Sequence, residues 1–159
     1  MQRRTLFAAM AVTAATLAFA GFAHAQERDL LDWSWTAEPV NSAGPQRTYR
    51  LEFEARIAEG FIIYGSDFAA ELGPRPTRLR FDQPDVKAEG PLLSLNTQRR
   101  TDKVFKTEYT YFDGKAHLAQ TVVVPSGASR LTGTIQGQTC DETDGTCALF
   151  SRKFDIDLR

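Results

Sequence analysis

The stretch Tyr49-Arg-Leu-Glu-Phe-Glu-Ala-Arg-Ile57 decides the fold of this chain. Apolar and charged residues alternate along it without interruption, so an extended backbone would carry one apolar face and one charged face. A period of two is typical of a strand in an antiparallel sheet, with one side buried and the other solvated. The stretch therefore predicts a sheet that covers a hydrophobic core on one side.

A turn signal at Asp113-Gly114 separates two further strand-like runs. Val104–Phe112 is rich in aromatic and β-branched residues, and Lys115–Val124 has apolar residues at alternate positions. Asp-Gly between two such runs is a strong short-range signal for a β-hairpin. The sequence therefore predicts that these two runs pair with each other.

The rest of the chain also favours strands. Further strand candidates are Phe61–Tyr64, Thr77–Phe81, Leu131–Gln138 and Arg152–Leu158. Pro74 and Pro76 exclude a helix before the second of these, and only a turn near Asp67–Leu72 has helical character. About seven or eight strands with turn signals between them, and no linker, predict one all-β domain, an immunoglobulin-like β-sandwich.

The N-terminus has the features of an export signal. Arg3 and Arg4 precede an apolar stretch, Leu6–Phe22, and Ala23-His24-Ala25 fits a small-x-small cleavage site. We expect a signal peptide over residues 1–25, cleaved after Ala25, and a domain over residues 26–159 in the periplasm. An uncleaved membrane anchor is the alternative. The two arginines leave both the Sec and the twin-arginine export routes open.

Charge and composition exclude several classes of function. The signal contains two arginines and no acidic residue, so its removal changes the formal net charge from −1 to −3. A mildly acidic domain is a poor candidate for nucleic acid, and we expect no nucleic-acid partner and a monomer. His117 is the one histidine outside the signal, and zinc usually takes four ligands. No metal and no cofactor are therefore expected.

Cys140 and Cys147 are the only cysteines of the chain, and both lie near its C-terminal end. In an oxidising compartment, two cysteines this close will form a disulfide or exchange one. We predict one intramolecular disulfide. If the disulfide is only a structural staple, it closes a loop of about eight residues and stabilises the fold by roughly 2.5 kcal/mol, because it restricts the denatured chain. From the residues alone, a staple is the favoured interpretation of this pair.

A family resemblance changes that balance. The segment Leu131–Cys140, the acidic loop after it and Cys147 resemble the active hairpin of the N-terminal periplasmic domain of the thiol:disulfide interchange protein DsbD. Four other segments also resemble that family: Glu59–Tyr64, Thr101–Phe105, Trp33-Ser34-Trp35 and Phe154–Leu158. The resemblance spans nearly all of the mature chain, and it implies an immunoglobulin-like fold. We expect a stand-alone version of that domain.

The resemblance implies a thiol-disulfide exchange function, with Cys140 and Cys147 as the catalytic pair. The domain would take electrons from the thioredoxin-like domain of a membrane electron transporter and pass them to periplasmic disulfide-containing proteins. This is the activity of a protein-disulfide reductase component, with Cys147 forming the mixed disulfide and Cys140 resolving it. The alternative is an exported immunoglobulin-like binding or chaperone domain whose disulfide is structural.

Residues around the pair receive supporting roles from the same resemblance. Asp102, Val104 and Phe105 are candidates for a cap over the cysteines, with Val104 and Phe105 competing for the capping position. An ordinary turn with a core aromatic residue is the alternative. Tyr64 is expected near the pair, where its hydroxyl would bond a sulfur or an acid; a buried core tyrosine is equally consistent.

The loop between the cysteines contains Asp141, Glu142 and Asp144. Nearby negative charge disfavours a thiolate, so these acids should leave the thiol pKa values normal or raised. The pair is then better suited to being attacked as a disulfide than to attacking proteins freely. The acids would also steer a basic partner, whereas a solvated turn is the simpler explanation of Asp and Gly here.

Overall fold

The computed structural model describes residues 30–41, 44–69, 73–101 and 106–158. The expected signal peptide and the three cap candidates, Asp102, Val104 and Phe105, lie outside these described residues. Within the described ranges, no helix is long and apolar enough to cross a membrane.

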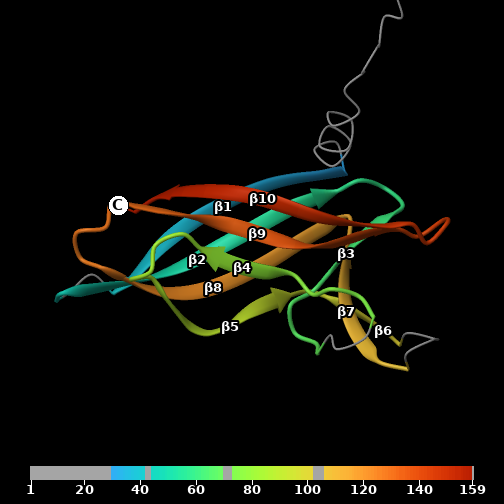
Figure 1. The fold of residues 1–159 in the computed structure, drawn as a ribbon, viewed down its shortest axis with the longest axis horizontal. Coiled ribbons are helices and arrows are strands. Elements are labelled where there is room, and N and C mark those ends of the chain that lie inside the picture. Colours follow the sequence, from blue (N-terminus) through green and yellow to red (C-terminus); the bar gives the residue numbers. More distant parts are fainter. Residues whose placement is uncertain (1–29, 42–43, 70–72, 102–105, 159) are drawn as a thin grey trace, which may run out of the picture.

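Ten strands occupy the described residues. They are β1 (Leu31–Asn41), β2 (Gln46–Ile57), β3 (Phe61–Tyr64), β4 (Arg78–Phe81), β5 (Lys87–Leu95), β6 (Gln98–Thr101), β7 (Glu108–Asp113), β8 (Lys115–Pro125), β9 (Arg130–Asp141) and β10 (Cys147–Asp157). One sheet has the order β1-β2-β8-β5, and the other has the order β10-β9-β3-β7-β6 with β4 paired to β9 (Figure 1). The predicted immunoglobulin-like sandwich of antiparallel sheets is confirmed.

The stretch from Tyr49 to Ile57 behaves as its alternation predicts. It forms most of β2, which pairs with β1 on one side and β8 on the other. Tyr49, Leu51 and Phe53 are at most 1% exposed, while the charged residues between them face away from the core. The apolar face of β2 therefore supplies one wall of the sandwich.

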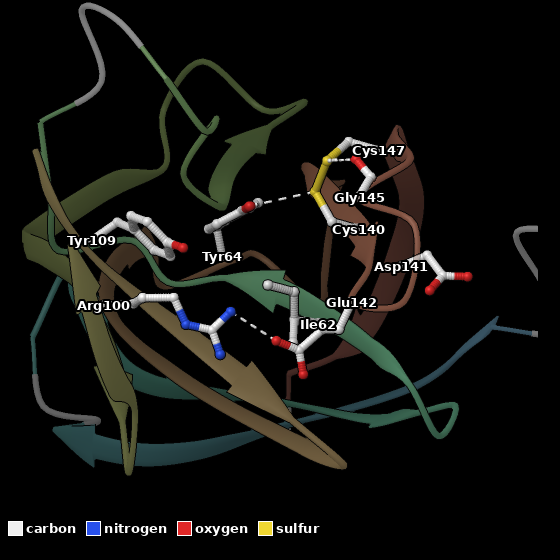
Figure 2. A pocket seen from close by; sticks show the side chains of 9 residues that line it. All are labelled: Ile62, Tyr64, Arg100, Tyr109, Cys140, Asp141, Glu142, Gly145 and Cys147. Carbon is white, nitrogen blue, oxygen red and sulfur yellow. Dashed lines mark hydrogen bonds and ion pairs between the residues drawn. A yellow bond between two sulfur atoms is a disulfide. The ribbon is translucent and has the colours of Figure 1, made fainter. Parts of the chain in front are cut away.

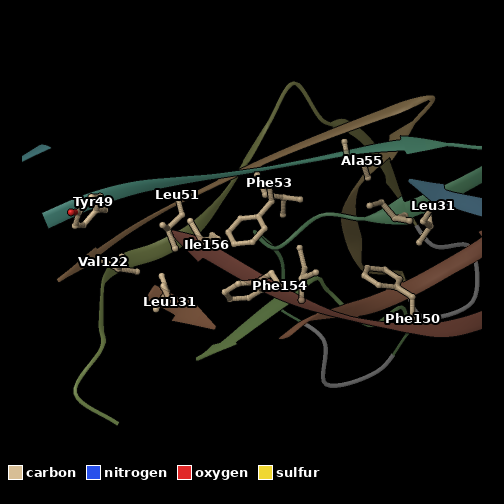
Figure 3. Close-up of a cluster of buried hydrophobic side chains, with 14 of the residues drawn as sticks. Leu31, Tyr49, Leu51, Phe53, Ala55, Val122, Leu131, Phe150, Phe154 and Ile156 are labelled. Atoms are coloured by element: carbon tan, nitrogen blue, oxygen red, sulfur yellow. The ribbon is translucent and has the colours of Figure 1, made fainter. Parts of the chain in front are cut away.

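Aliphatic and aromatic side chains fill the space between the sheets (Figure 3). Phe154 of β10 lies at their centre, with its ring centroid 5.1 Å from that of Phe53 and 6.0 Å from that of Phe81. A Cβ on Gly133 of β9 would come within 2.4 Å of the Phe154 ring. Glycine at this position is therefore required by packing rather than by backbone conformation.

The prediction of a β-hairpin at Asp113-Gly114 is wrong. β7 pairs with β3 and β6 in one sheet, whereas β8 pairs with β2 and β5 in the other. The Asp-Gly turn, with Gly114 at φ 62°, carries the chain across the sandwich between the sheets. Both strands have apolar side chains that are buried. Each strand belongs to a different sheet, so the two do not pair although they are neighbours in the sequence.

Three strands were not expected from the sequence, namely β1, β5 and β6. Gly90-Pro91 interrupts the strand signal of β5, and the β5–β8 register shifts between Glu89 and Leu93. All four residues of β6 are exposed, so this strand has no apolar face to detect. Residues 66–68 form a bend where a helical turn was expected, and residues 70–72 lie outside the described ranges.

Candidate redox site

The two cysteines lie opposite each other on the β9–β10 hairpin, which projects at one end of the sandwich (Figure 1). Cys140 is the last residue but one of β9, and Cys147 is the first residue of β10. Their Cα atoms are 4.1 Å apart and a disulfide joins them. The connecting turn is closed by a hydrogen bond from the Asp141 N–H to the Thr146 carbonyl. Gly145 adopts φ 76°, a left-handed conformation that glycine takes without strain.

The disulfide lies on the face of the six-stranded sheet that points away from the sandwich core. Side chains alternate along β9, and Leu131 and Ile135 point inward. Cys140 has the opposite parity and joins a separate cluster of buried residues. This outer cluster contains Ile62, Tyr64, Tyr109, Tyr111 and Cys140, with Phe68 packed against it. The cysteine pair therefore has an aromatic environment of its own.

The two sulfurs have different surroundings (Figure 2). Cys140 is 5% exposed, whereas Cys147 is exposed. The Tyr64 hydroxyl lies 3.3 Å from Cys140 Sγ, and because a disulfide sulfur has no hydrogen, the hydroxyl is the donor. Gln138 Nε2 lies 3.8 Å from the same sulfur. Cys147 Sγ instead lies 3.5 Å from the Gly145 carbonyl oxygen, which would repel a negative charge on that sulfur.

Arg100 of β6 reaches the pocket beside the disulfide (Figure 2). Its guanidinium lies 4.5 Å from the Tyr111 ring centroid, and one nitrogen lies 2.8 Å from a carboxylate oxygen of Glu142. The hydrogen bond to Glu142 raises the pKa of Arg100, so the guanidinium stays protonated. The pair ties the β6–β7 hairpin to the cysteine loop. Arg100 was not expected at the site, because nothing in the local sequence indicates a contact between residues this far apart.

The three loop acids have separate roles in the turn. Asp141 accepts a hydrogen bond from the Thr143 N–H, and Asp144 accepts one from the Thr146 N–H at 2.7 Å. The backbone N–H of Thr146 lowers the pKa of Asp144, which therefore remains a carboxylate at neutral pH. Glu142 is the acid neutralised by Arg100. Two of the three acids thus fix the turn, and their expected effect on the thiols stays a prediction.

Of the sequence-predicted site residues, the structure brings Tyr64 and the loop acids Asp141 and Glu142 around the cysteines. The three cap candidates lie outside the described residues, and their role stays a prediction. Among the residues that the structure describes, no group of three or more His, Cys, Asp or Glu side chains gathers to hold a metal.

We expect Tyr64→Phe to slow reduction of the disulfide by dithiothreitol about fivefold, which corresponds to the net worth of one hydrogen bond, roughly 1 kcal/mol. Attack on Cys147 would release Cys140 as a thiolate, and the Tyr64 hydroxyl lies where it donates to that sulfur. Tyr109→Phe is the matched control, since Tyr109 lines the same pocket and no hydrogen bond joins its hydroxyl to a sulfur. Equal rates for the two variants would show that the Tyr64 hydroxyl does not assist the leaving sulfur.

The fold and the site together define a class of protein, an immunoglobulin-like sandwich domain with a disulfide on an edge hairpin. A family model described as the N-terminal domain of thiol:disulfide interchange protein DsbD matches residues 33–157. The chain therefore belongs to the DsbD N-terminal domain family, and the resemblance stated from the sequence is confirmed. The sequence has no significant match among curated proteins.

One solved structure shares this fold, and two others are similar to the chain at lower TM-scores. The N-terminal periplasmic domain of ScsB from Proteus mirabilis has a TM-score of 0.55 and 14% identity, over 81% of this chain. This chain spans only 47% of that structure. The reduced N-terminal domain of DsbD from Neisseria meningitidis has a TM-score of 0.48 and 19% identity, over 77% of this chain and 84% of that one. A complex of the DsbD and PilB N-terminal domains from N. meningitidis has a TM-score of 0.46 and 16% identity, over 76% and 80%.

Proposed function

We propose that this protein is a periplasmic thiol-disulfide exchange protein that carries two electrons on Cys140 and Cys147. One observation carries the proposal: the disulfide joins an exposed residue, Cys147, to a buried one, Cys140, whose sulfur accepts a hydrogen bond from Tyr64. A structural staple requires no such asymmetry, whereas an exchange site needs one sulfur to be attacked and another to leave.

The exchange begins when a donor thiolate attacks Cys147 Sγ. A new S–S bond forms between donor and Cys147, the Cys140–Cys147 bond breaks, and its electron pair leaves on Cys140 Sγ. The Tyr64 hydroxyl, 3.3 Å away, donates to that thiolate before it takes up a proton. Release of Cys140 rather than Cys147 is favoured because the Gly145 carbonyl oxygen faces Cys147.

The donor's second thiolate then attacks the donor sulfur of the mixed disulfide and releases Cys147 as a thiolate. The donor ends as a disulfide, and this protein ends as a dithiol that has gained two electrons and two protons. The reduced pair passes the electrons on by the same chemistry in reverse, through attack of the exposed Cys147 on an acceptor disulfide.

The exchange chemistry and the family together indicate which proteins would donate and accept the electrons. The donor is a thioredoxin-like domain of a membrane electron transporter, and the acceptors are disulfide-containing proteins of the periplasm. The acids of the turn, the half-buried Asp141 and the exposed Asp144 among them, favour a partner with a basic rim around its reactive cysteine. Cleavage of the signal after Ala25 would deliver the domain of residues 26–159 to that compartment.

The reduction potential of the Cys140–Cys147 pair tests the proposal. We expect a value above about −300 mV, because structural disulfides of secreted proteins lie below that value and resist thiol reductants. Equilibration of the protein with glutathione or dithiothreitol buffers, followed by alkylation and mass spectrometry, measures it. A potential below that limit would instead support an exported binding or chaperone domain whose disulfide is a staple.

A further inference from the structure

β10 is an edge strand, because it pairs with β9 alone in its sheet. Opposed residues in antiparallel strands alternate between pairs that exchange hydrogen bonds and pairs that exchange none, whose Cα atoms lie about 4.5 Å apart. Cys140 and Cys147 are 4.1 Å apart, and the neighbouring pair is bonded from the Asp141 N–H to the Thr146 carbonyl. The cysteines are thus a non-bonded pair, and the N–H and C=O of Cys147 point outward, away from β9.

Every second residue of β10, counted from Cys147, has its backbone N–H and C=O directed away from β9 in the same way. Residues related in this way have the same parity. Leu149 lies two residues beyond Cys147 and opposite Gln138, so its backbone groups also point outward. Asp155 has this parity too, and its carbonyl accepts a hydrogen bond from the Trp35 indole of β1 at 3.0 Å. The far end of the β10 edge is therefore covered by the other sheet. At the near end, β10 has no further strand beside it among the described residues, and no backbone–backbone hydrogen bond outside the strand ladders involves Cys147 or Leu149 there.

An apolar side chain stands beside this open edge. Leu149 is 61% exposed, a high value for a large hydrophobic residue on a strand. Because it lies two residues from Cys147, its side chain is on the same face of the sheet as the disulfide. Phe150, which follows it, points into the core and is 1% exposed. The edge thus combines free backbone groups, an exposed apolar side chain and a reactive sulfur.

The chemistry of exchange brings a partner to this edge. A thiolate attacks a disulfide in line with the S–S bond, from the side opposite the leaving sulfur. Since Cys140 is on β9 and Cys147 is on β10, the line from Cys140 through Cys147 continues outward over the open edge of β10. Whatever segment flanks the attacking cysteine therefore lies beside the unpaired groups of Cys147 and Leu149.

We infer that a thioredoxin-like reductant docks by adding an extended segment to the Cys147–Leu149 edge, with the Leu149 side chain against apolar surface beside its nucleophilic cysteine. This inference rests on the proposed exchange function and names the surface that function uses. Strand addition supplies main-chain hydrogen bonds for affinity, and the neighbouring side chain adds specificity. An edge that is open at one end only also limits pairing with unintended strands.

Leu149→Pro tests the inference, because it removes the outward N–H while leaving the β9–β10 hydrogen bonds in place. Reduction of the disulfide is followed with reduced thioredoxin and with dithiothreitol as separate reductants. We expect the variant to react about tenfold more slowly with thioredoxin, the size of one or two lost hydrogen bonds, and at an unchanged rate with dithiothreitol. Leu149→Ala, which keeps the N–H, should give a smaller decrease.

Lys153→Pro is the matched control, since Lys153 has the same parity but lies farther from the disulfide. It should leave both rates unchanged. A second measurement does not depend on proline: in the mixed disulfide between thioredoxin and the Cys140→Ser variant, the amides of Cys147 and Leu149 should become protected from hydrogen exchange.

The outcomes separate the docking surface from the proposed function. If thioredoxin reduces the wild type faster than dithiothreitol does at equal thiolate concentration, the exchange function stands. An unchanged thioredoxin rate in Leu149→Pro, an equal decrease with both reductants, or unprotected amides in the mixed disulfide would then overturn the docking surface alone. If thioredoxin reduces the wild type no faster than dithiothreitol, the proposed function fails and the docking surface with it.

Discussion

The Cys140→Ser variant is expected to form a mixed disulfide with a thioredoxin whose resolving cysteine is replaced, about a hundredfold faster than Cys147→Ser does. In the first variant the remaining thiol is the exposed Cys147; in the second it is Cys140, which is 5% exposed. A buried sulfur reacts with a protein only after local opening of the hairpin. The thioredoxin cysteine is supplied as its thionitrobenzoate disulfide, so that release of the coloured thiolate reports each reaction.

Both variants lack the disulfide, which costs each of them about 2.5 kcal/mol in the chain-entropy model, so they form a matched pair. Circular dichroism and a melting curve establish that both remain folded. Faster reaction of Cys147→Ser would assign the attacked sulfur to Cys140 and would reverse the mechanism. If neither variant reacts faster than a denatured control, the disulfide is a structural staple.

The fold could be predicted as far as its signals are local. The alternation from Tyr49 to Ile57 defines β2 because one face of that strand meets the core and the other meets water. The choice of sheet is not local, and here the prediction fails at Asp113-Gly114. β7 takes its partners from β3 and β6, and β8 takes its own from β2 and β5. A turn signal specifies that the chain reverses, not that the flanking strands pair.

The site follows the same division. The cysteine pair and its disulfide could be predicted because the short spacing of the only two cysteines is visible in the sequence, and the family resemblance adds Tyr64. Arg100 could not be predicted, since its contact with Glu142 joins β6 to the cysteine loop across the outer face of the sheet. The outward backbone of Cys147 and Leu149 depends on the β9–β10 register, which requires the three-dimensional pairing.

Phe154→Ala should lower the free energy of unfolding by about 3–5 kcal/mol, the usual cost of removing a buried phenyl ring. The ring is 2% exposed and contacts Phe53 of the opposite sheet as well as Phe81 of β4. Gly133 lies directly beneath it, so no side chain on β9 can fill the cavity. Urea unfolding measures the loss, which should appear as a lower midpoint without a change in slope.

The same substitution should leave disulfide chemistry intact, which separates the stability of this fold from its function. Phe154 lies seven residues beyond Cys147 on β10, a span of about 24 Å at the rise of a strand, and it faces the core rather than the outer cluster. Below the unfolding transition, the rate of reduction by dithiothreitol should equal that of the wild type. Leu149→Ala is the control on the same strand, because an exposed side chain should contribute less than about 0.5 kcal/mol. A loss under about 1 kcal/mol for Phe154→Ala would mean that this ring is not part of a close-packed core.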